Sequence, residues 1–332
     1  MFISVDLPEP DAPMMATISP ASIFRLMPLS TATELSQIWT GPVLSGGNFP
    51  RMQKYTQWPS DHPKKGTMGD PVFDNFIKGQ MQFVQNQGEL AVPAGIALLD
   101  AIGKPVIMLT HSQGGGFGFD VTEARPNLVA GMVSIEPGGP QIGNVDTAKV
   151  AYTRTNPNSW GLTTNPYKFD PPINSPSELK THLEPSERPG DEVGCYMQDA
   201  PVHKLVNWQN KRILSISAEG TYHRVFDVCI PKWLNQAGAK VDFIRLEDVG
   251  IRGNMHEMFL DRNSDEIMVE GCPTSEMQPF GPYGCADKWS VMWHAGWRQY
   301  ETVTKALSAV LLAAMDGPLT RAEAISLLNT VA

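Results

Sequence analysis

Residues 105–116 read PVIMLTHSQGGG, and this stretch decides the fold. The apolar run at 106–109 predicts a buried strand, which stops at the small residue Thr110. Ser112 lies two residues after Thr110. After Gln113, three glycines open a segment of helical character that runs to Arg125. A strand that turns sharply on a serine into a glycine-opened helix is a nucleophile elbow, which lifts the serine hydroxyl above the edge of the sheet.

The usual elbow pattern is G-x-S-x-G, and this chain departs from it at one position. Thr110 stands where the first glycine is expected, whereas Gly114 occupies the second glycine position. The turn is strained, so the residues around the serine must be small. Because threonine is small, its replacement of glycine at position 110 is a modest departure, and the pattern still predicts that Ser112 is a nucleophile.

Three further stretches rich in apolar residues after the elbow predict strands, at residues 128–135, 212–218 and 241–246. The first of these ends in Glu136 and the second in Glu219. Ten residues beyond the third run, a glycine-containing loop carries His256. A serine nucleophile needs a histidine base and an acid that orients it, and in this arrangement both follow the serine along the chain.

These motifs resemble the α/β-hydrolase serine esterases whose triad acid is a glutamate. The segments that carry the resemblance are LTHSQGG around Ser112, IEPGGP with Glu136, GNMHEMFLDRNSDEI with His256, YTQWPS at 55–60, GDPVFDNF at 69–76 and LLDAIG at 98–103. The resemblance covers residues 36–270 and implies the α/β class with an α/β-hydrolase fold. Such a fold has a mostly parallel sheet, flanking helices and a cap-like insertion, which we expect at about 138–207.

The resemblance implies a catalytic triad of Ser112, His256 and Glu136 in an esterase that works through an acyl-enzyme on Ser112. Glu219 remains the alternative acid, because many relatives in the wider fold carry the acid after the later strand. The backbone N–H of Gln113 is the expected first donor of the oxyanion hole. The expected substrate is a small-molecule carboxylic ester, and neither a cofactor nor a metal ion is expected.

The first 35 residues do not fit this fold. They contain prolines at positions 8, 10, 13, 20 and 28 and show neither a two-residue nor a helical apolar period. We therefore expect residues 1–35 to be unrelated or disordered, and the N-terminal half of the sheet to be missing from the chain as written. The second oxyanion donor normally follows one of those earlier strands. The rival source is PVLSGG at 42–47, which offers Gly46 and Gly47.

Two functions follow from this mixture of features. The first is a serine carboxylic-ester hydrolase, impaired by the loss of the oxyanion-loop strand. The second is an inactive hydrolase-fold protein, or a truncated gene product, that at most binds small apolar ligands. In either case strand 105–110 would be an unpaired apolar edge, which favours aggregation. We therefore expect low solubility or low activity for the chain as written.

Length and charge limit the class of protein. A chain of 332 residues suits one large α/β domain with a cap, and a hydrophobic content of 42% supports a sizeable core. A net charge of −9 argues against a nucleic-acid partner. No apolar run reaches the roughly 18 residues that a membrane-spanning helix needs. The chain as written starts with no recognisable signal peptide, so the compartment stays open, as does the oligomeric state.

The remaining landmarks are cysteines, histidines and a C-terminal tryptophan pattern. The four cysteines permit two disulfides without fixing their pairing: Cys195, Cys229, Cys272 and Cys285. Cys272 and Cys285 flank a loop rich in Pro and Gly and could be bridged. Structural or exposed positions are expected for His111, His203, His223 and His294, with His111 placed to shape the pocket. Tryptophans at 289, 293 and 297 predict a helical C-terminal extension over 271–332.

Overall fold

The computed structural model of the chain describes residues 36–40, 49–78, 87–139, 141–154, 160–264 and 266–267. Apart from the last two, these residues belong to one compact unit. Several predictions therefore fall outside the described residues. They concern the N-terminal 35 residues, the Gly46–Gly47 pair, the Cys272 and Cys285 thiols, and the C-terminal helical extension.

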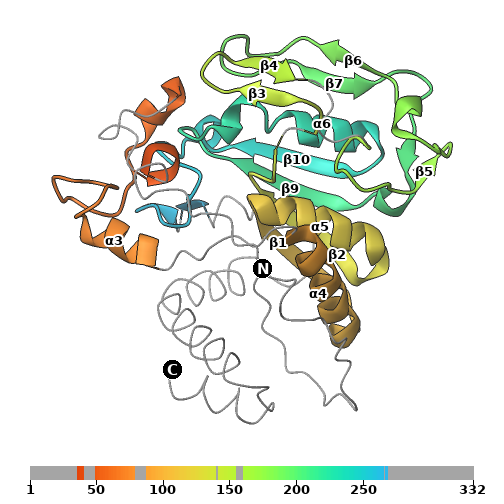
Figure 1. The fold of residues 1–332 in the computed structure, drawn as a ribbon, viewed down its shortest axis with the longest axis horizontal. Coiled ribbons are helices and arrows are strands. Elements are labelled where there is room, and N and C mark those ends of the chain that lie inside the picture. The colour runs from red at the N-terminus through yellow and green to blue at the C-terminus, as the bar shows by residue number, and fades with distance from the viewer. Residues whose placement is uncertain are drawn as a thin grey trace, which may run out of the picture. The chain divides into compact units, whose positions relative to one another are not determined.

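The centre of the unit is a four-stranded sheet in the order β1-β2-β9-β10 (Figure 1). Its strands are β1 (Val106–His111), β2 (Val129–Ile135), β9 (Arg212–Ser217) and β10 (Lys240–Arg245). All three pairings are parallel. The four predicted strands thus form one sheet, and their carboxyl ends lie along a common edge.

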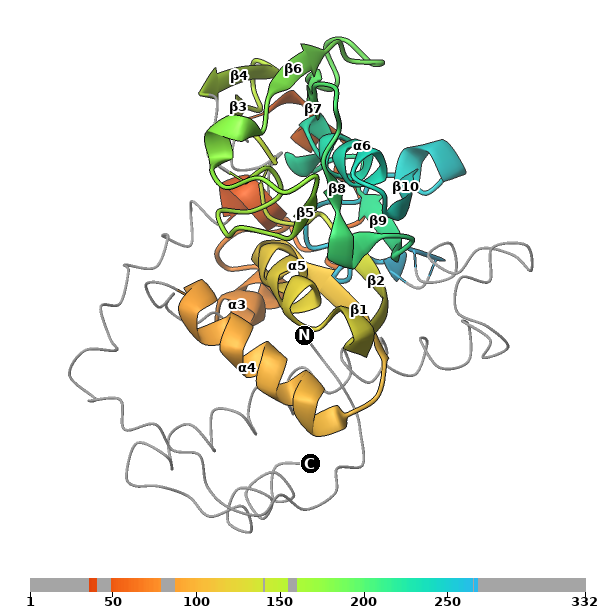
Figure 2. The ribbon, with the colours of Figure 1, turned by 90° about the vertical axis from the view of Figure 1, so that its right-hand side faces the viewer.

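Helices flank this sheet and bury its apolar side chains. They are α4 (Gln87–Ile102), α5 (Gln113–Ala124) and α6 (Cys229–Gln236), whereas α3 (Pro71–Lys78) packs in a separate cluster with Trp58 and Met255. Phe119 of α5 and Trp233 of α6 join one core with Met132 and Ile213 of the sheet, so both helices cover the same face. α4 packs against α5 (Figure 2). The sheet is parallel and has flanking helices, and a sharp turn connects β1 to α5. These features confirm the predicted α/β-hydrolase fold.

Short helical turns connect these elements. They are η2 (Ser36–Thr40), η3 (Pro50–Lys54), η4 (Pro126–Leu128), η5 (Pro176–Glu178), η6 (Val206–Trp208), η7 (His223–Val225) and η8 (Leu246–Val249). The turn η7 lies between β9 and α6, and η8 follows β10 directly. The turn η8 leads into the loop that carries His256, and η7 carries His223, whose ring contacts that histidine.

The chain between β2 and β9 forms three small antiparallel pairs. These are β3 (Asn144–Asp146) with β4 (Ala151–Arg154), β5 (Phe169–Asp170) with β8 (Lys204–Leu205), and β6 (Thr181–Glu184) with β7 (Cys195–Gln198). They occupy the region predicted as a cap-like insertion at 138–207. β7 packs on α6, which ties this region to the sheet domain. A capping role for the region stays a prediction.

Among the described residues, β1 pairs with β2 alone. The other edge of β1 is the one for which the sequence predicts no partner strand. Because residues 1–35 and 41–48 are not described, that expectation stays a prediction. The consequences drawn from it for solubility and activity also stay predictions.

A disulfide joins Cys195 of β7 to Cys229 of α6. Both cysteines are buried, in a cluster with Val193, Val225 and Phe226. The bond therefore links the β2–β9 insertion covalently to a helix of the sheet domain. The sequence permitted this pairing but gave no reason to prefer it.

We expect Cys195→Ala/Cys229→Ala to lower the free energy of unfolding by about 3–4 kcal/mol. The physical reason is that the cross-link, at a sequence separation of 34, removes chain entropy from the unfolded state. Urea denaturation with and without reductant measures the effect. Reductant should lower the midpoint of the wild type by much more than that of the double variant, in which only Cys272 and Cys285 remain. Equal midpoints for the oxidised wild type and the double variant would contradict this expectation.

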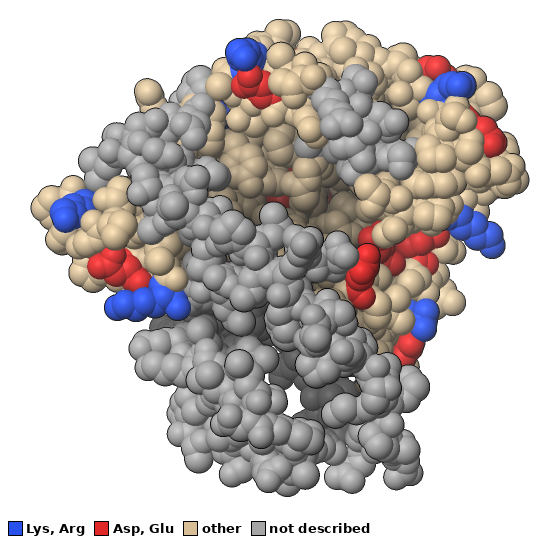
Figure 3. All heavy atoms as spheres, in the orientation of Figure 1, with Lys and Arg blue, Asp and Glu red and all other residues tan. Residues whose placement is uncertain are grey.

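No helix among the described residues is long and apolar enough to cross a bilayer. On the face seen in Figure 3, the Lys and Arg side chains of the described residues are scattered, and most lie beside an acidic side chain. Ion pairs of this kind include Arg125 with Asp100 and Arg262 with Asp61. The basic residues on this face therefore do not form a continuous patch within the described part of the chain.

Candidate active site

Ser112 occupies the turn between β1 and α5. Its φ of 51° and ψ of −129° lie in a region that residues with a Cβ rarely adopt. Two backbone hydrogen bonds tie the turn to β2 and the loop after it, and a third, from the N–H of Gly115 to the carbonyl of Ser112 at 2.8 Å, lies at the start of α5. The N–H of Ser112 donates to the carbonyl of Ile135 at 3.0 Å, and the N–H of Gly138 donates to the carbonyl of Ser112 at 2.7 Å. The end of β2 and the loop after it therefore hold the serine in its strained conformation.

Two glycines of α5 allow the helix to approach the sheet closely. A Cβ on Gly115 would lie 2.3 Å from the Cβ of Pro137, and a Cβ on Gly118 would lie 2.4 Å from Cγ2 of Thr110. The methyl group of Thr110 thus occupies space that Gly118 leaves open. This explains why threonine is accommodated where the elbow pattern has glycine. Gly114, at the second glycine position of the pattern, has open space beside it.

Gly115→Ala should lower the free energy of unfolding by about 1–3 kcal/mol, because the new methyl group overlaps Pro137. Gly116→Ala is the matched control in the same helix, since a Cβ there meets no heavy atom within 4 Å. Alanine at 116 should leave stability unchanged or raise it by up to about 1 kcal/mol through helix propensity. Thermal or urea unfolding of the two variants makes the comparison. A Gly115→Ala variant as stable as the Gly116→Ala variant would contradict the packing argument.

Ser112, His256 and Glu136 form a hydrogen-bonded chain at the carboxyl ends of the strands. Nε2 of His256 lies 2.8 Å from Oγ of Ser112, and Nδ1 of His256 lies 2.5 Å from Oε2 of Glu136. Because a carboxylate only accepts, Nδ1 carries the hydrogen, and Nε2 is free to accept from the serine hydroxyl. Both Glu136 and His256 have an exposed fraction of 0%. The base and the acid are therefore shielded from water.

The carboxylate of Glu136 is fixed by two further donors. The N–H of Ala218 donates to Oε1 at 2.7 Å, and the hydroxyl of Thr221 donates to Oε2 at 2.8 Å. Burial and the negative charge of Asp227 hold the pKa of Glu136 well above its ordinary value, although the hydrogen bonds from Ala218 and Thr221 act in the opposite direction. Glu136 also has a positive φ of 42°, at the sharp turn that ends β2. The acid, like the nucleophile, is thus held in a conformation that its surroundings impose.

Glu219, the alternative acid, lies in a different set of contacts. Its carboxylate accepts from Nη1 of Arg252 at 2.9 Å and from the N–H of Gly253 at 3.1 Å. Nζ of Lys54 lies 3.8 Å from the same carboxylate. These contacts anchor the loop that leads to His256 without involving its ring. The structure thus brings Glu136 to the imidazole and gives Glu219 a supporting place.

Aromatic side chains surround the imidazole of His256. The ring centroids of His111 and Tyr222 lie 4.5 Å and 5.2 Å from it, and that of Trp39 lies 6.2 Å away. Nε2 of His111 lies 3.0 Å from the backbone carbonyl of His256, so this nitrogen carries the hydrogen that His111 donates. Burial lowers the pKa of His111 to about 3. Burial also lowers the pKa of His256 well below its ordinary value, which favours the neutral imidazole that a base requires.

His223 belongs to this group of rings, which the sequence did not predict. Its ring stacks on that of His256, with centroids 4.6 Å apart and an interplanar angle of 8°. Nδ1 of His223 lies 3.0 Å from Oδ1 of Asp227. The sequence placed His223 among the histidines expected to be structural or exposed; the residue is 1% exposed, and its contact with the base was not predicted. The His-Asp spacing of four residues, about one helical turn, is the signal that could have found this pair.

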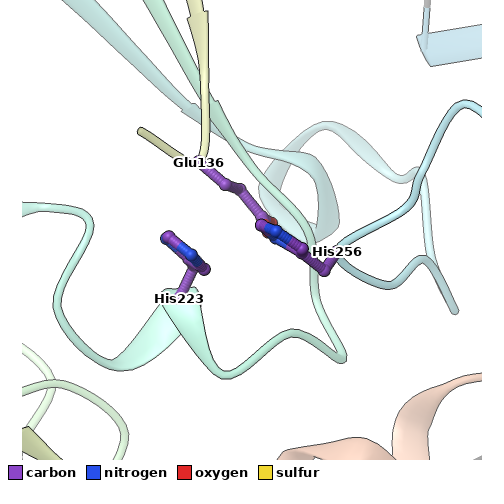
Figure 4. Close-up of side chains that lie close together, drawn as sticks. All are labelled: Glu136, His223 and His256. Atoms are coloured by element: carbon purple, nitrogen blue, oxygen red, sulfur yellow. The ribbon is translucent and has the colours of Figure 1, made fainter. Parts of the chain in front are cut away.

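Glu136, His223 and His256 each offer one ligand atom, and these atoms lie within 4.8 Å of one another (Figure 4). A lone pair on an imidazole nitrogen lies in the plane of its ring. Because the two rings are stacked nearly parallel, their lone pairs cannot converge on one ion. The two nitrogens of His256 are moreover engaged with Glu136 and Ser112. The geometry of this cluster suits proton transfer better than metal binding.

Of the predicted oxyanion donors, the structure describes Gln113 but not Gly46 or Gly47. Gln113 is the first residue of α5, so its N–H has no carbonyl partner within the helix and remains available next to Ser112. Gly46 and Gly47, the predicted second source of a donor, lie outside the described residues. The arrangement therefore offers one backbone donor beside the nucleophile within the described part of the chain.

Comparisons with known proteins give the following. No protein-family model matches the chain. The probable secreted lipase phiG from Fungal sp. (strain ATCC 74256) is 38% identical over 224 residues, which cover 66% of this chain and 58% of that protein. A solved structure described as the atomic resolution structure of a novel bacterial esterase covers 64% of this chain and 52% of its own, at 16% identity. Its TM-score of 0.30 is too low to support any inference.

Proposed function

We propose that the protein is a serine carboxylic-ester hydrolase of the lipase and esterase kind that works through an acyl-enzyme on Ser112. The observation that carries this proposal is the hydrogen-bonded chain from Ser112 through His256 to Glu136, with the serine on a strained turn into α5. The resemblance to a protein named as a probable secreted lipase supports an ester as the substrate class. The chain covers little more than half of that protein, so its activity comes to this chain as part of the proposal.

In the first half of the reaction, Oγ of Ser112 attacks the carbonyl carbon of the ester while Nε2 of His256 takes the hydroxyl proton. The carbonyl oxygen becomes an oxyanion and accepts a hydrogen bond from the N–H of Gln113. One such donor typically contributes on the order of 100- to 1000-fold in turnover. The tetrahedral intermediate then collapses, the C–O bond to the alcohol breaks, and the leaving alcohol takes the proton from His256.

In the second half, water attacks the acyl-enzyme. His256 takes a proton from this water, the new tetrahedral intermediate expels Oγ of Ser112, and the serine recovers its proton from the imidazole. Glu136 stabilises the imidazolium in both halves, because its carboxylate lies 2.5 Å from Nδ1. The products are a carboxylic acid and an alcohol, and no atom of the enzyme is consumed.

The purified chain should hydrolyse p-nitrophenyl esters, and a series from acetate through butyrate and octanoate to palmitate tests this directly. Release of p-nitrophenol above the rate of the heat-denatured chain is the expected result. The order of kcat/KM along the series shows whether short or long acyl groups fit better. A folded chain that accelerates the hydrolysis of none of these esters would contradict the proposed function.

We also propose that the protein works in an oxidising compartment. The Cys195–Cys229 disulfide supports this, since such bonds persist mainly outside reducing cytosol. The word "secreted" in the name of the similar lipase agrees with it. In protein isolated from the cells that make it, Cys195 and Cys229 should resist alkylation under denaturing conditions until reductant is added. Alkylation without reductant would contradict an oxidising compartment.

A further inference from the structure

A second histidine–carboxylate pair lies against the catalytic pair. Nδ1 of His223 and Oδ1 of Asp227 are 3.0 Å apart, and the two side chains are 1% and 0% exposed. The His223 ring covers one face of the His256 ring, with centroids 4.6 Å apart and an interplanar angle of 8°. Two imidazoles, each bonded through Nδ1 to its own buried carboxylate, are therefore stacked face to face.

The two pairs share a hydrogen-bond network. The hydroxyl of Thr221 donates to Oε2 of Glu136 at 2.8 Å and accepts from the backbone N–H of His223 at 3.2 Å. This bridge fixes the start of η7 relative to the carboxylate that orients His256. A small shift of His223 would therefore disturb Glu136 as well, which makes the stacked geometry a property of the whole network.

Burying such a pair costs free energy, and apolar side chains of similar volume often stabilise a core better. His223 and Asp227 take no proton from the substrate or from Ser112 in the reaction described above. A buried polar pair that touches the base but stands outside the proton transfers calls for a role exercised through the base. Because the His223 ring is stacked on the His256 ring, this role concerns the protonated, positively charged form of His256.

We propose that His223 and Asp227 form a positioning pair that holds the catalytic imidazole in place and stabilises its protonated form. Nδ1–H of His223 donates to the Asp227 carboxylate, which makes the His223 ring more electron-rich. When His256 gains its proton, the positive ring faces this polarised ring, with the negative charge of Asp227 behind it. The buried surroundings weaken this attraction far less than water would. The inference rests on the proposed role of His256 as the base.

Other charged and titratable groups also act on His256 and remain in place when the pair is changed. These groups are His111 from β1, which lowers the pKa of His256; Glu136 and Tyr222, which contact the His256 ring; Glu257, the next residue in the loop; and Arg224, whose positive charge opposes the rise in the pKa of Asp227 that burial causes. His223 also lowers the pKa of His256, so the stabilisation of the protonated ring comes from the charge of Asp227. Burial raises the pKa of Glu257 to about 7. Since the same groups are present in every variant below, a difference between variants reports on the His223–Asp227 pair.

The test is the pH dependence of kcat/KM for a p-nitrophenyl ester. Asp227→Asn removes a negative charge that favours the imidazolium, so the pKa of His256 falls further. The acid limb of the profile should then move to lower pH by about one unit. The plateau of kcat should fall several-fold because a base of lower pKa is weaker, and KM should change little. Asp227→Glu keeps the charge and should restore the wild-type limb.

Two further variants separate this role from a merely structural one. His223→Phe/Asp227→Leu replaces the pair by apolar groups that suit a buried site, and its acid limb should move in the same direction. Asp199→Asn is the matched control, because His182 and Asp199 form the same kind of pair, 2.7 Å apart, but are 51% and 46% exposed. Its profile should coincide with that of the wild type.

An acid limb that stays in place in both Asp227→Asn and the double variant would overturn the inference, as would a limb that moves to higher pH. These outcomes differ from failure of the proposed function. If the wild type hydrolyses no ester and Ser112 takes no acylating probe, the role of His256 as the base is lost first. An active wild type with unchanged variants removes only the positioning role of His223 and Asp227.

Discussion

Ser112→Ala should reduce ester hydrolysis by at least about 10⁴-fold while leaving the fold intact. The serine hydroxyl is the atom that forms the covalent bond to the acyl group, and alanine offers no substitute. Ser112 lies on the strained turn, so removing only Oγ keeps the backbone geometry and the contacts of β1 and α5. The measurement is kcat/KM for a p-nitrophenyl ester, with circular dichroism as the check on folding.

The matched control for this variant is Ser177→Ala, a serine of η5 in an exposed stretch of the insertion. Its kcat/KM should equal that of the wild type. A Ser112→Ala variant that keeps more than a hundredth of the wild-type rate would mean that hydrolysis does not pass through an acyl-enzyme on this residue.

The second large effect is expected at the acid. Glu136→Gln should reduce kcat by roughly 10³- to 10⁴-fold, because the amide no longer fixes the tautomer of His256 or stabilises its imidazolium. The carboxylate of Glu136 lies 2.5 Å from Nδ1 and is bonded to Ala218 and Thr221, so the substitution removes one charge from an otherwise fixed group. Kinetics with a p-nitrophenyl ester measure the loss.

Glu219→Gln makes the comparison sharp, because Glu219 ends the next strand and was the rival acid. It anchors the loop through Arg252 and Gly253, so its loss should lower stability more than turnover. We expect a fall in kcat of less than about 10-fold. The reverse ranking, with Glu219→Gln the more damaging to turnover, would move the acid to Glu219.

Sequence patterns sufficed for those parts of the molecule that local chemistry determines. The apolar run at 128–135 gave β2 almost to the residue, because a buried parallel strand is apolar on both faces. The strained turn at Ser112 was recognisable for a similar reason, since its small neighbours are adjacent in the chain. The order of serine, acid and histidine along the chain was the one that the resemblance to α/β-hydrolases implies.

What the sequence could not supply depends on contacts between distant segments. Glu136 and Glu219 each follow a strand, and although the resemblance favoured Glu136, only the path of the final loop decides which carboxylate meets His256. The Thr110 departure is explained by Gly118, eight residues later, through helix–sheet packing. The partner of Cys195 depends on how the insertion docks on α6. For the same reason the burial of His223 against the base was missed.

The most direct test of the central claim is to treat the folded chain with a fluorophosphonate and locate the adduct by peptide mass spectrometry. Such a reagent requires an activated serine but little complementarity to a substrate. The account predicts one adduct per chain, on Ser112, formed slowly or not at all in His256→Ala because the proton acceptor is gone. A folded wild-type chain that takes no adduct, or takes it on another residue, would contradict the claim that Ser112 is the nucleophile.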